Sequence, residues 1–140
     1  MRAVILGCGR VGASLANELC ARGHRVSIID RSQDAFRRLN EDFSGEPILG
    51  TGIDQEILET AGINEAELFV AVTENDCINL MASQIVKLIY RVNKVITRIY
   101  DPDREEIFRD LGYTTVCPTR VAASLLRGKV VQPTPSQGAG

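Results

Sequence analysis

The sequence predicts an α/β domain: a doubly wound, parallel six-stranded sheet of strand order 3-2-1-4-5-6 with helices on both faces. Three observations predict it. A glycine-rich turn at 7–12 joins the apolar run 3–6 to a helical pattern. Short β-rich runs then alternate with amphipathic segments along the whole chain. The run 68–72 is continuously apolar, which is typical of a parallel strand buried on both faces.

The first half of the chain contains three of the expected strands, at 2–6, 25–29 and 47–49. A helix is expected over 10–22, and its inward face is expected to consist of Val11, Leu15 and Leu19. A second helix is expected to begin near Ser32. A third is expected after Asp54, which is a suitable N-cap.

The second half repeats the alternation, with strands expected at 68–72, 94–99 and 114–117. A helix is expected from about Asn75, because apolar residues follow it at i, i+3, i+4 and i+7 spacing. Asp101 and Pro102 supply the N-cap and the first residue of the next helix, which Gly112 ends. Two successive β-α-β-α-β units predict a Rossmann-like sheet whose topological switch lies between the first and fourth strands.

Composition limits the classes of partner. The 140 residues suit a single domain with one two-faced core. A net charge of −2 predicts no basic surface for nucleic acid. No apolar run approaches the roughly 18 residues of a spanning helix, so membrane insertion is not expected. The N-terminus leads straight into a strand, so a signal peptide is not expected either. The four cysteines form no CxxC pair and there is one histidine, so reduced thiols are expected rather than a zinc site.

The glycine turn gives the strongest functional indication. Gly7 allows a sharp turn out of the strand, Gly9 lets a pyrophosphate approach the backbone, and Gly12 lets the helix lie close to the sheet. Free N–H groups at the start of that helix favour a phosphate. Asp30 ends the second strand at about the distance expected of an acid that binds a ribose diol. The turn predicts a nucleotide-binding site, and the alternative is an α/β fold with an empty pocket.

Parallel strands place their carboxyl ends along one edge of the sheet, which locates the expected crevice. One side is expected to be the glycine turn, and the other the segment 73–76. The same edge is expected to carry Asp30, the turn 50–52 and Arg98. His24 is expected at the opposite edge, as a solvated turn residue rather than a catalytic group.

A series of motifs covers roughly residues 1–128: 4–12, 23–26 with 29–30, 58–63, 71–80, and 111–112 before Val116. In order and spacing they resemble the TrkA N-terminal, or RCK (regulator of potassium conductance), domain family. The resemblance implies a cytoplasmic regulatory module that binds NAD(H) or adenine nucleotides. It also implies a homodimer or a higher ring assembly. Its partner would be a membrane-embedded potassium transporter or channel subunit, at the inner face of the membrane.

Three positions are interpreted in the light of that family. The family usually carries an acid directly after the first glycine of the third-strand turn, where it helps to hold adenosine, and here that residue is Thr51. Arg31 stands close to where the family often has a second acid, and it either stacks on adenine or faces solvent. In the resembled family an arginine at the position of Arg10 meets the phosphates. A solvent-facing role is the alternative.

Arg98 is a charged residue in a buried strand, so it needs a partner. That partner is expected to be either a nucleotide phosphate or a carboxylate such as Asp76 or Asp101. Thr73 is expected to face the ligand, because it ends the fourth strand beside the glycine turn. The full set of candidate nucleotide-binding residues is Gly7, Gly9, Arg10, Val11, Gly12, Asp30, Arg31, Gly50, Thr51, Thr73, Glu74, Asn75 and Arg98.

The chain is expected to divide into a nucleotide-binding domain at 1–117, a helix at 118–130 for crossover or dimer contact, and a flexible tail at 131–140. The helix carries one apolar stripe, formed by Val121, Ala122, Leu125 and Leu126. The stripe either closes its own sheet edge or packs on a neighbour. Together with Ile107, Phe108 and Leu111 it is expected to form a homodimer. The second lobe common in the resembled family is absent, so an N-lobe of a longer protein or a single-lobe subunit is expected.

Three classes of function follow from these observations. The first is a nucleotide-sensing regulatory subunit, the second a nucleotide-binding fragment of an NAD-dependent oxidoreductase, and the third an interaction module with an unused pocket. No enzyme activity is expected, because the fold leaves no substrate domain and no placed acid or base. The expected ligands are NAD(H), ADP, ATP and AMP. NADP is disfavoured because Asp30 would repel its 2′-phosphate.

Overall fold

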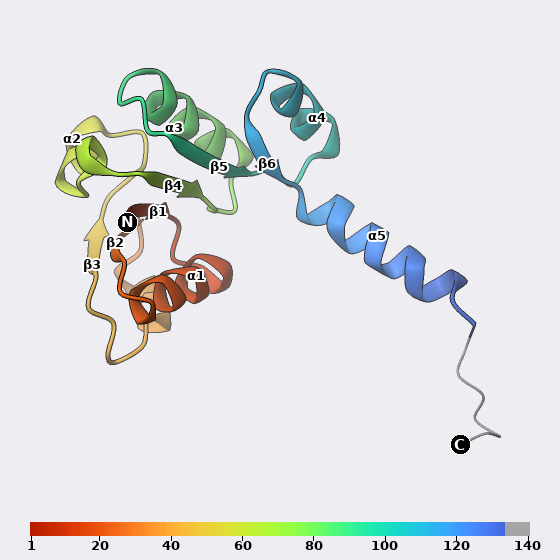
Figure 1. Ribbon diagram of the computed structural model, residues 1–140, viewed down its shortest axis with the longest axis horizontal. Helices are drawn as coiled ribbons and strands as arrows, with labels where there is room; N and C mark the ends of the chain where they lie inside the picture. The colour runs from red at the N-terminus through yellow and green to blue at the C-terminus, as the bar shows by residue number, and fades with distance from the viewer. Residues whose placement is uncertain (134–140) are drawn as a thin grey trace.

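The computed structural model describes residues 1–133, and its centre is a six-stranded parallel sheet (Figure 1). The strands are β1 (Arg2–Leu6), β2 (Arg25–Asp30), β3 (Glu46–Leu49), β4 (Leu68–Ala71), β5 (Lys94–Arg98) and β6 (Thr114–Val116). Their order is β3-β2-β1-β4-β5-β6, which confirms the predicted doubly wound topology. β1 is paired with β2 on one side and with β4 on the other, so the topological switch lies between β1 and β4.

Helices connect successive strands, and one further helix follows the last strand. The α-helices are α1 (Arg10–Ala21), α2 (Gln55–Thr60), α3 (Asp76–Leu88), α4 (Pro102–Asp110) and α5 (Pro118–Val131). Two short 3₁₀ helices complete the set, η1 (Gln33–Arg38) and η2 (Ile63–Glu65). No helix among residues 1–133 combines the length and the apolar character needed to cross a membrane.

The core has two layers, one on each face of the sheet, because successive strand residues point to opposite faces. Ala3 and Ile5 of β1 belong to the layer that α1 and η1 cover. Val4 and Leu6 belong to the layer that α2, η2 and α3 cover. All four side chains are buried, as expected of a central parallel strand.

The segment after β2 differs from the prediction. Instead of an α-helix beginning near Ser32, it forms the 3₁₀ helix η1, in which Ala35 N–H donates to Ser32 C=O. A run of six residues that buries only Ala35 gains little from packing, and 3₁₀ geometry is common in such short connections. The chain is extended again at Leu39.

Helix α1 also differs from the prediction in its inward face. Val11 is 54% exposed, and the residues that α1 buries are Gly12, Ala13 and Ala16. Leu15 and Leu19 are half-buried and flank this contact. Small residues occupy the centre because the helix approaches the sheet closely at its first turn. Val11 is therefore left at the surface, beside the glycine turn.

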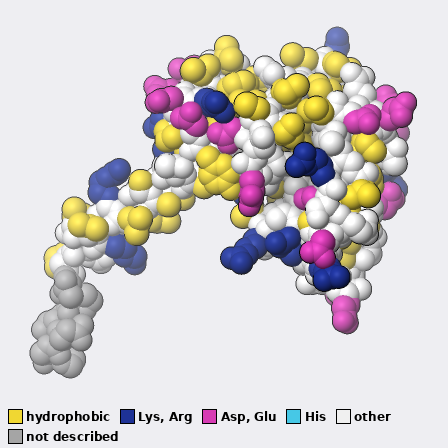
Figure 2. Space-filling model, turned by 180° about the vertical axis from the view of Figure 1, so that it is seen from behind, with side chains coloured by type: hydrophobic (Ala, Val, Ile, Leu, Met, Phe, Trp, Pro, Cys, Tyr) yellow, Lys and Arg dark blue, Asp and Glu magenta, His cyan; other side chains and the backbone are white. Residues whose placement is uncertain are grey.

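Helix α5 extends away from the sheet and its covering helices (Figure 1). It buries none of its residues. Leu125 is 66% exposed, and apolar side chains run along the projecting helix (Figure 2). Of the two arrangements considered from the sequence, closure of its own sheet edge is therefore not the one adopted. The predicted tail at 131–140 begins at the last residue of α5, and 134–140 lie outside the described residues.

Candidate functional site

The carboxyl ends of the strands bring the predicted site residues to one edge of the sheet. The glycine turn follows β1, Asp30 ends β2, and Arg98 ends β5. The turn 50–52 follows β3, and the segment 73–75 joins β4 to α3. Because β1 and β4 are adjacent, with Leu6 paired to Ala71, the glycine turn and the segment 73–75 flank the switch point. Ligands of open α/β sheets bind at such a crevice.

Two glycines of the turn are required by close packing. Gly7 has φ +108°, and a Cβ there would lie 2.8 Å from the carbonyl carbon and oxygen of Val72. A Cβ on Gly12 would overlap the carbonyl oxygen of Gly7 and lie 3.3 Å from Cγ2 of Val72. Gly9 is different, because a Cβ there would meet no atom within 4 Å. The space beside the α-carbon of Gly9 is thus open, and the sequence predicts a phosphate at this turn.

The N-terminus of α1 is distinct from those of the three helices α2, α3 and α4. Each of those three has a side-chain cap, since Asp54, Asn75 and Asp101 accept from backbone N–H groups of their first turns. The N-cap of α1 is Gly9, which has no side chain to offer. The first bond inside the helix runs from Ala13 N–H to Gly9 C=O, so three N–H groups precede it. An anion at this end would receive hydrogen bonds and a favourable helix dipole.

Asp30 is held beside the glycine turn by two backbone donors. Cys8 N–H donates to Oδ2 at 2.8 Å, and Ser32 N–H donates to Oδ1 at 2.8 Å. Each carboxylate oxygen keeps a further lone pair, so the group can still accept from ribose hydroxyls. Asp30 therefore lies beside the glycine turn with acceptor capacity to spare, and its role toward a ribose stays a prediction.

Arg38 is a residue at this edge that sequence reasoning missed. Its Nη1 donates to the carbonyl oxygen of Cys8 at 3.5 Å, so the Cys8 peptide is held by Asp30 at its N–H and by Arg38 at its C=O. Nothing in the sequence separates Arg38 from the other arginines after β2. Its place on η1 follows from how that segment folds back on the turn.

Cys8 lies within the glycine turn as a buried, unreactive thiol. Its Sγ donates to the carbonyl of Ala35 at 3.4 Å. Burial, followed by the nearby charge of Asp30, raises the pKa of Cys8 to about 11. The thiol is therefore protonated at neutral pH, and Cys8 is a packing residue of the turn rather than a nucleophile.

Thr73 lies at the crevice, but its hydroxyl is engaged inside the β4–α3 connection. Oγ1 lies 2.6 Å from Oδ1 of Asn79 and 3.1 Å from the carbonyl oxygen of Asn75. Asn79 is fully buried, and its amide also donates to the carbonyls of Thr73 and Arg98. This network fixes the end of β4 to the end of β5. Asn75 caps α3 through Ile78 N–H, and Glu74 is exposed beside it.

No carboxylate accepts from Arg98 among residues 1–133, so the carboxylate alternative is wrong. Its Nη2 donates to the carbonyls of Val72 at 2.8 Å and Thr73 at 3.0 Å, and the guanidinium lies 4.9 Å from the centre of the Tyr100 ring. Asp76 is used elsewhere, since it accepts from the N–H groups of Tyr100 and Asp101. The side chain of Arg98 is only 9% exposed, and its Nε has no acceptor among the described residues.

The other candidate residues line the same edge. Arg10 begins α1 and is exposed, and Arg31 is exposed directly after β2. Gly50 N–H donates to the carbonyl of Asp30 at 3.0 Å, which joins the third-strand turn to the end of β2. Thr51 is half-buried next to it. Within residues 1–133, no three His, Cys, Asp or Glu side chains gather as a metal ion would require.

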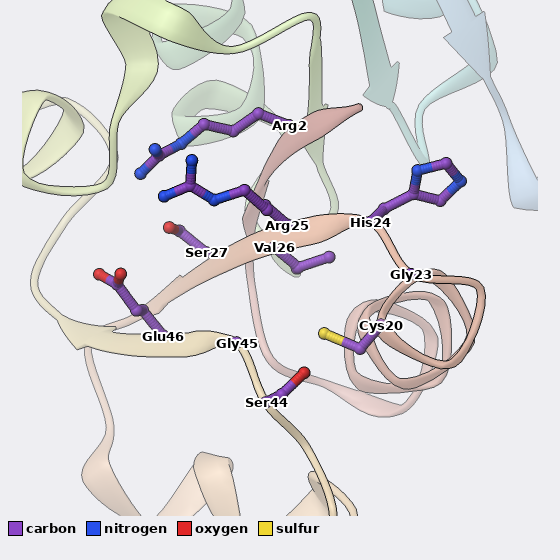
Figure 3. Close-up of a pocket in the computed structure, with 10 residues that line it drawn as sticks. All are labelled: Arg2, Cys20, Gly23, His24, Arg25, Val26, Ser27, Ser44, Gly45 and Glu46. Carbon is purple, nitrogen blue, oxygen red and sulfur yellow. The ribbon is translucent and has the colours of Figure 1, made fainter.

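A separate hollow of about 230 Å³ lies at the opposite edge of the sheet (Figure 3). Arg2 and Arg25 extend from the starts of β1 and β2 on one side of it, and His24 lies in the turn after α1. His24 thus lies at the edge that the sequence predicts, away from the glycine turn. Arg2 donates to Ala61 C=O at 3.5 Å, at the C-terminus of α2, so its charge complements that helix end. Helix C-termini disfavour an anion, so we do not assign the nucleotide site to this hollow.

The family model and the similar proteins of known sequence agree on one family. A family model for the TrkA-N domain matches residues 3–119. The Trk system potassium uptake protein TrkA of Streptomyces coelicolor is 45% identical over 123 residues, covering 88% of this chain and 55% of that protein. A TrkA homolog of Methanothermobacter thermautotrophicus is 37% identical over 134 residues, covering 95% of this chain and 62% of that protein. The chain thus spans less than two thirds of the length of these two relatives.

Solved structures with the same fold include proteins with bound nucleotides. The TrkA-N domain of the inner membrane protein ybaL from Escherichia coli has a TM-score of 0.80 at 20% identity, covering 94% of this chain and 96% of that chain. The Shewanella denitrificans Kef CTD in its AMP-bound form has a TM-score of 0.79 at 23% identity, covering 94% and 80%. The GsuK channel bound to NAD has a TM-score of 0.69 at 20% identity, covering 84% and 21%. At these identities the likeness shows the fold.

Proposed function

The chain belongs to the TrkA-N domain family, and we propose that it is a nucleotide-sensing regulatory subunit or domain of a potassium uptake system or channel. NAD(H), ADP and ATP are the proposed ligands, and AMP belongs to the same class. The observation that carries the proposal is the start of α1. This N-terminus lies at the switch point, and its backbone N–H groups have no side-chain cap. The space beside Gly9 is open, so these N–H groups are available to a phosphate.

Asp30 determines which nucleotides fit. Its carboxylate accepts from the 2′- and 3′-hydroxyls of an adenosine ribose, and a 2′-phosphate would bring a second negative charge to it. Two unit charges about 4 Å apart repel by roughly 4 kcal/mol at an effective dielectric constant near 20. NADP(H) should therefore bind at least about a hundredfold more weakly than NAD(H).

Titration calorimetry with NAD, NADH, ADP, ATP, AMP and NADP tests the proposal directly. Gly9→Val is the matched site variant, because a Cβ at this position meets no atom within 4 Å, and the larger side chain should occupy the space over the turn. We expect the wild type to bind and Gly9→Val to keep its melting temperature without ligand while losing the nucleotide. Asp30→Asn should narrow the difference between NAD and NADP. Equal binding of NAD and NADP by the wild type would contradict the assignment of Asp30.

Arg10 is proposed to meet the phosphates. A charge-assisted hydrogen bond contributes about 1.5–3 kcal/mol, so Arg10→Ala should weaken ATP and ADP about tenfold or more. AMP should lose less, because fewer of its phosphates are within reach. Equal losses for ATP, ADP and AMP would indicate a disturbed glycine turn instead.

We propose that the chain regulates rather than catalyses. The relatives carry the name of a potassium uptake protein, and His24 lies at the edge opposite the glycine turn. NADH incubated with the protein and a panel of carbonyl substrates should keep its absorbance, because no hydride is transferred. Turnover that disappears in Gly9→Val would favour an oxidoreductase fragment.

The proposed assembly is a homodimer or a higher ring on the cytoplasmic face of a membrane-embedded potassium transporter or channel subunit. The apolar stripe of α5 supports it, because Val121, Leu125 and Leu126 are exposed at the surface. Ile107 and Leu111 of α4 are exposed as well. Phe108 contributes less than expected, since it is half-buried and packs edge-on against Tyr113. Sedimentation velocity at tens of micromolar should show a dimer.

A further inference from the structure

Helix α5 is attached to the rest of the chain near its first turn. Thr119 Oγ1 donates to the carbonyl of Tyr100 at 2.7 Å. Arg120 donates to the carbonyl of Pro102 at 3.1 Å and forms ion pairs with Glu105 and Glu106. All of these partners belong to residues 100–106, the connection after β5 and the first part of α4. Since α5 buries no residue, its position depends on these few polar contacts.

Tyr100 connects this attachment to the nucleotide crevice. Its ring lies against the guanidinium of Arg98, 4.9 Å from centre to Cζ, and its N–H donates to Asp76 at the start of α3. Its carbonyl oxygen accepts a hydrogen bond from Oγ1 of Thr119 and, at 3.6 Å, another from the thiol of Cys117. One residue is therefore in contact with the end of β5, with α3 and with the first turn of α5.

Arg98 continues this series of contacts to the glycine turn. Its Nη2 donates to the carbonyls of Val72 and Thr73. The Val72–Thr73 peptide is also the surface on which Gly7 rests, since a Cβ on Gly7 would lie 2.8–2.9 Å from that peptide. Arg98 is nine-tenths buried and its Nε–H has no acceptor among the described residues. A phosphate at the switch point would attract this cation and compete with the carbonyls and the ring that now hold it.

We propose that Arg98, Tyr100 and Thr119 couple the crevice to α5, so that a bound nucleotide changes how firmly the first turn of α5 is held. This inference rests on the proposed function, because it requires a nucleotide in the crevice. Arg98 and Thr119 act in it as positioning residues. The consequence is regulatory: the helix with the exposed apolar stripe is the element that responds to the ligand. By linkage, whatever loosens α5 also alters nucleotide affinity.

Amide hydrogen exchange of the full chain, with and without saturating ADP, tests the coupling. In the wild type, ADP should change the exchange rate of peptides covering 118–131 by about fivefold or more, the lower range of allosteric couplings. Thr119→Val keeps the shape of the side chain and removes its donor, so the change should fall below about twofold. Thr119→Ser should restore it. Because the coupling is reciprocal, Thr119→Val should also change the dissociation constant of ADP, which calorimetry measures. That constant should change by the same factor by which the effect of ADP on α5 exchange is reduced.

Thr60→Val is the matched control, because Thr60 makes the same kind of hydroxyl–carbonyl bond, to Glu56 at 2.9 Å, in a helix outside the proposed route. It should respond to ADP like the wild type. Sedimentation velocity with and without ADP checks that association is the same in all variants. If ADP binds and α5 exchange is unchanged, or if Thr119→Val responds like the wild type, the coupling is wrong and the proposed function stands. If neither ADP nor NAD binds the wild type, the proposed function fails and the coupling fails with it.

Discussion

Helices α1 and α5 are similar in length and opposite in packing. α1 has 12 residues and buries Gly12, Ala13 and Ala16 against the sheet. α5 has 14 residues and buries none, although its stripe of valine and leucine is more apolar than the buried face of α1. A hydrophobic stripe indicates which side of a helix will be covered, and it does not indicate by what. In α1 the cover is the chain's own sheet, and in α5 we propose that it is a second copy.

The difference also separates two kinds of sensitivity to substitution. The start of α1 is in contact with backbone atoms that cannot move without disturbing β1 and β4. The body of α5 is in contact with little in its own chain. Substitutions at the start of α1 should therefore change the free energy of unfolding, whereas substitutions in the apolar stripe of α5 should change association.

The largest effect is expected at Gly12. Gly12→Ala places a methyl group against the carbonyl oxygen of Gly7, which is backbone and cannot turn away. We expect a loss of about 3 kcal/mol in the free energy of unfolding, at the upper end for overpacked sites. Urea denaturation followed by circular dichroism measures it. A variant as stable as the wild type would show that α1 does not lie as close to the turn as described.

The next effect is expected at Leu125, where the result should be dissociation without unfolding. Leu125→Glu places a charge in the stripe of both subunits. Losing the burial of a leucine costs about 1.5 kcal/mol in each subunit, so the dimer loses about 3 kcal/mol, or roughly 150-fold in its dissociation constant. Sedimentation equilibrium should show that weakening. Ser124→Glu adds the same charge outside the stripe and should leave association unchanged. A dimer equally tolerant of both substitutions would place the interface elsewhere.

A smaller, pH-dependent effect is expected at Cys8. Burial raises the pKa of this thiol in the folded state from 9.0 to about 11, so the unfolded state loses its proton first as pH rises. The stabilisation is complete below about pH 9 and is lost as pH rises through 11. Between pH 8 and pH 10 the wild type should lose about 1 kcal/mol more than Cys8→Ser. If the free energies of unfolding of the wild type and Cys8→Ser changed equally with pH, the raised pKa of Cys8 would be refuted.

The smallest effect is expected at Gly128, the glycine of α5. A Cβ there would meet no atom within 4 Å, so Gly128→Ala only improves helix propensity. The gain should be about 0.5–1 kcal/mol and should appear as greater helicity by circular dichroism. Destabilisation would contradict this expectation, because it would show that Gly128 lies in close contact with other atoms, as Gly12 does.

Much of the crevice could be predicted from local patterns. The glycine turn, Asp30 and the strand order all follow from residues that are near one another in the chain. Periodicity distinguishes strands from helices, and alternating strands and helices allow few parallel arrangements. The caps of α2 and α4 were predicted for the same reason, since Asp54 and Asp101 act on N–H groups two residues away.

The errors concern contacts between segments far apart in the chain. Val11 fits a helical stripe and is exposed, because the sheet meets the small residues that follow it. The segment after Ser32 has helical spacing and forms a 3₁₀ turn, because it has too little core to cover. Of the two partners that the sequence allows for Arg98, the carboxylate is wrong, because within the chain its Nη2 donates to the carbonyls of Val72 and Thr73.

The sequence by itself determined the doubly wound sheet, the glycine turn at its switch point and the acid that ends β2. These depend on side-chain size, periodicity and capping within a few residues. Only the tertiary structure decided that Arg38 holds the turn, that Arg98 and Tyr100 lie between the crevice and Thr119, and that α5 extends away from its own sheet. Partners across the fold are selected by which surfaces meet once the strands have paired, and no local pattern encodes that choice.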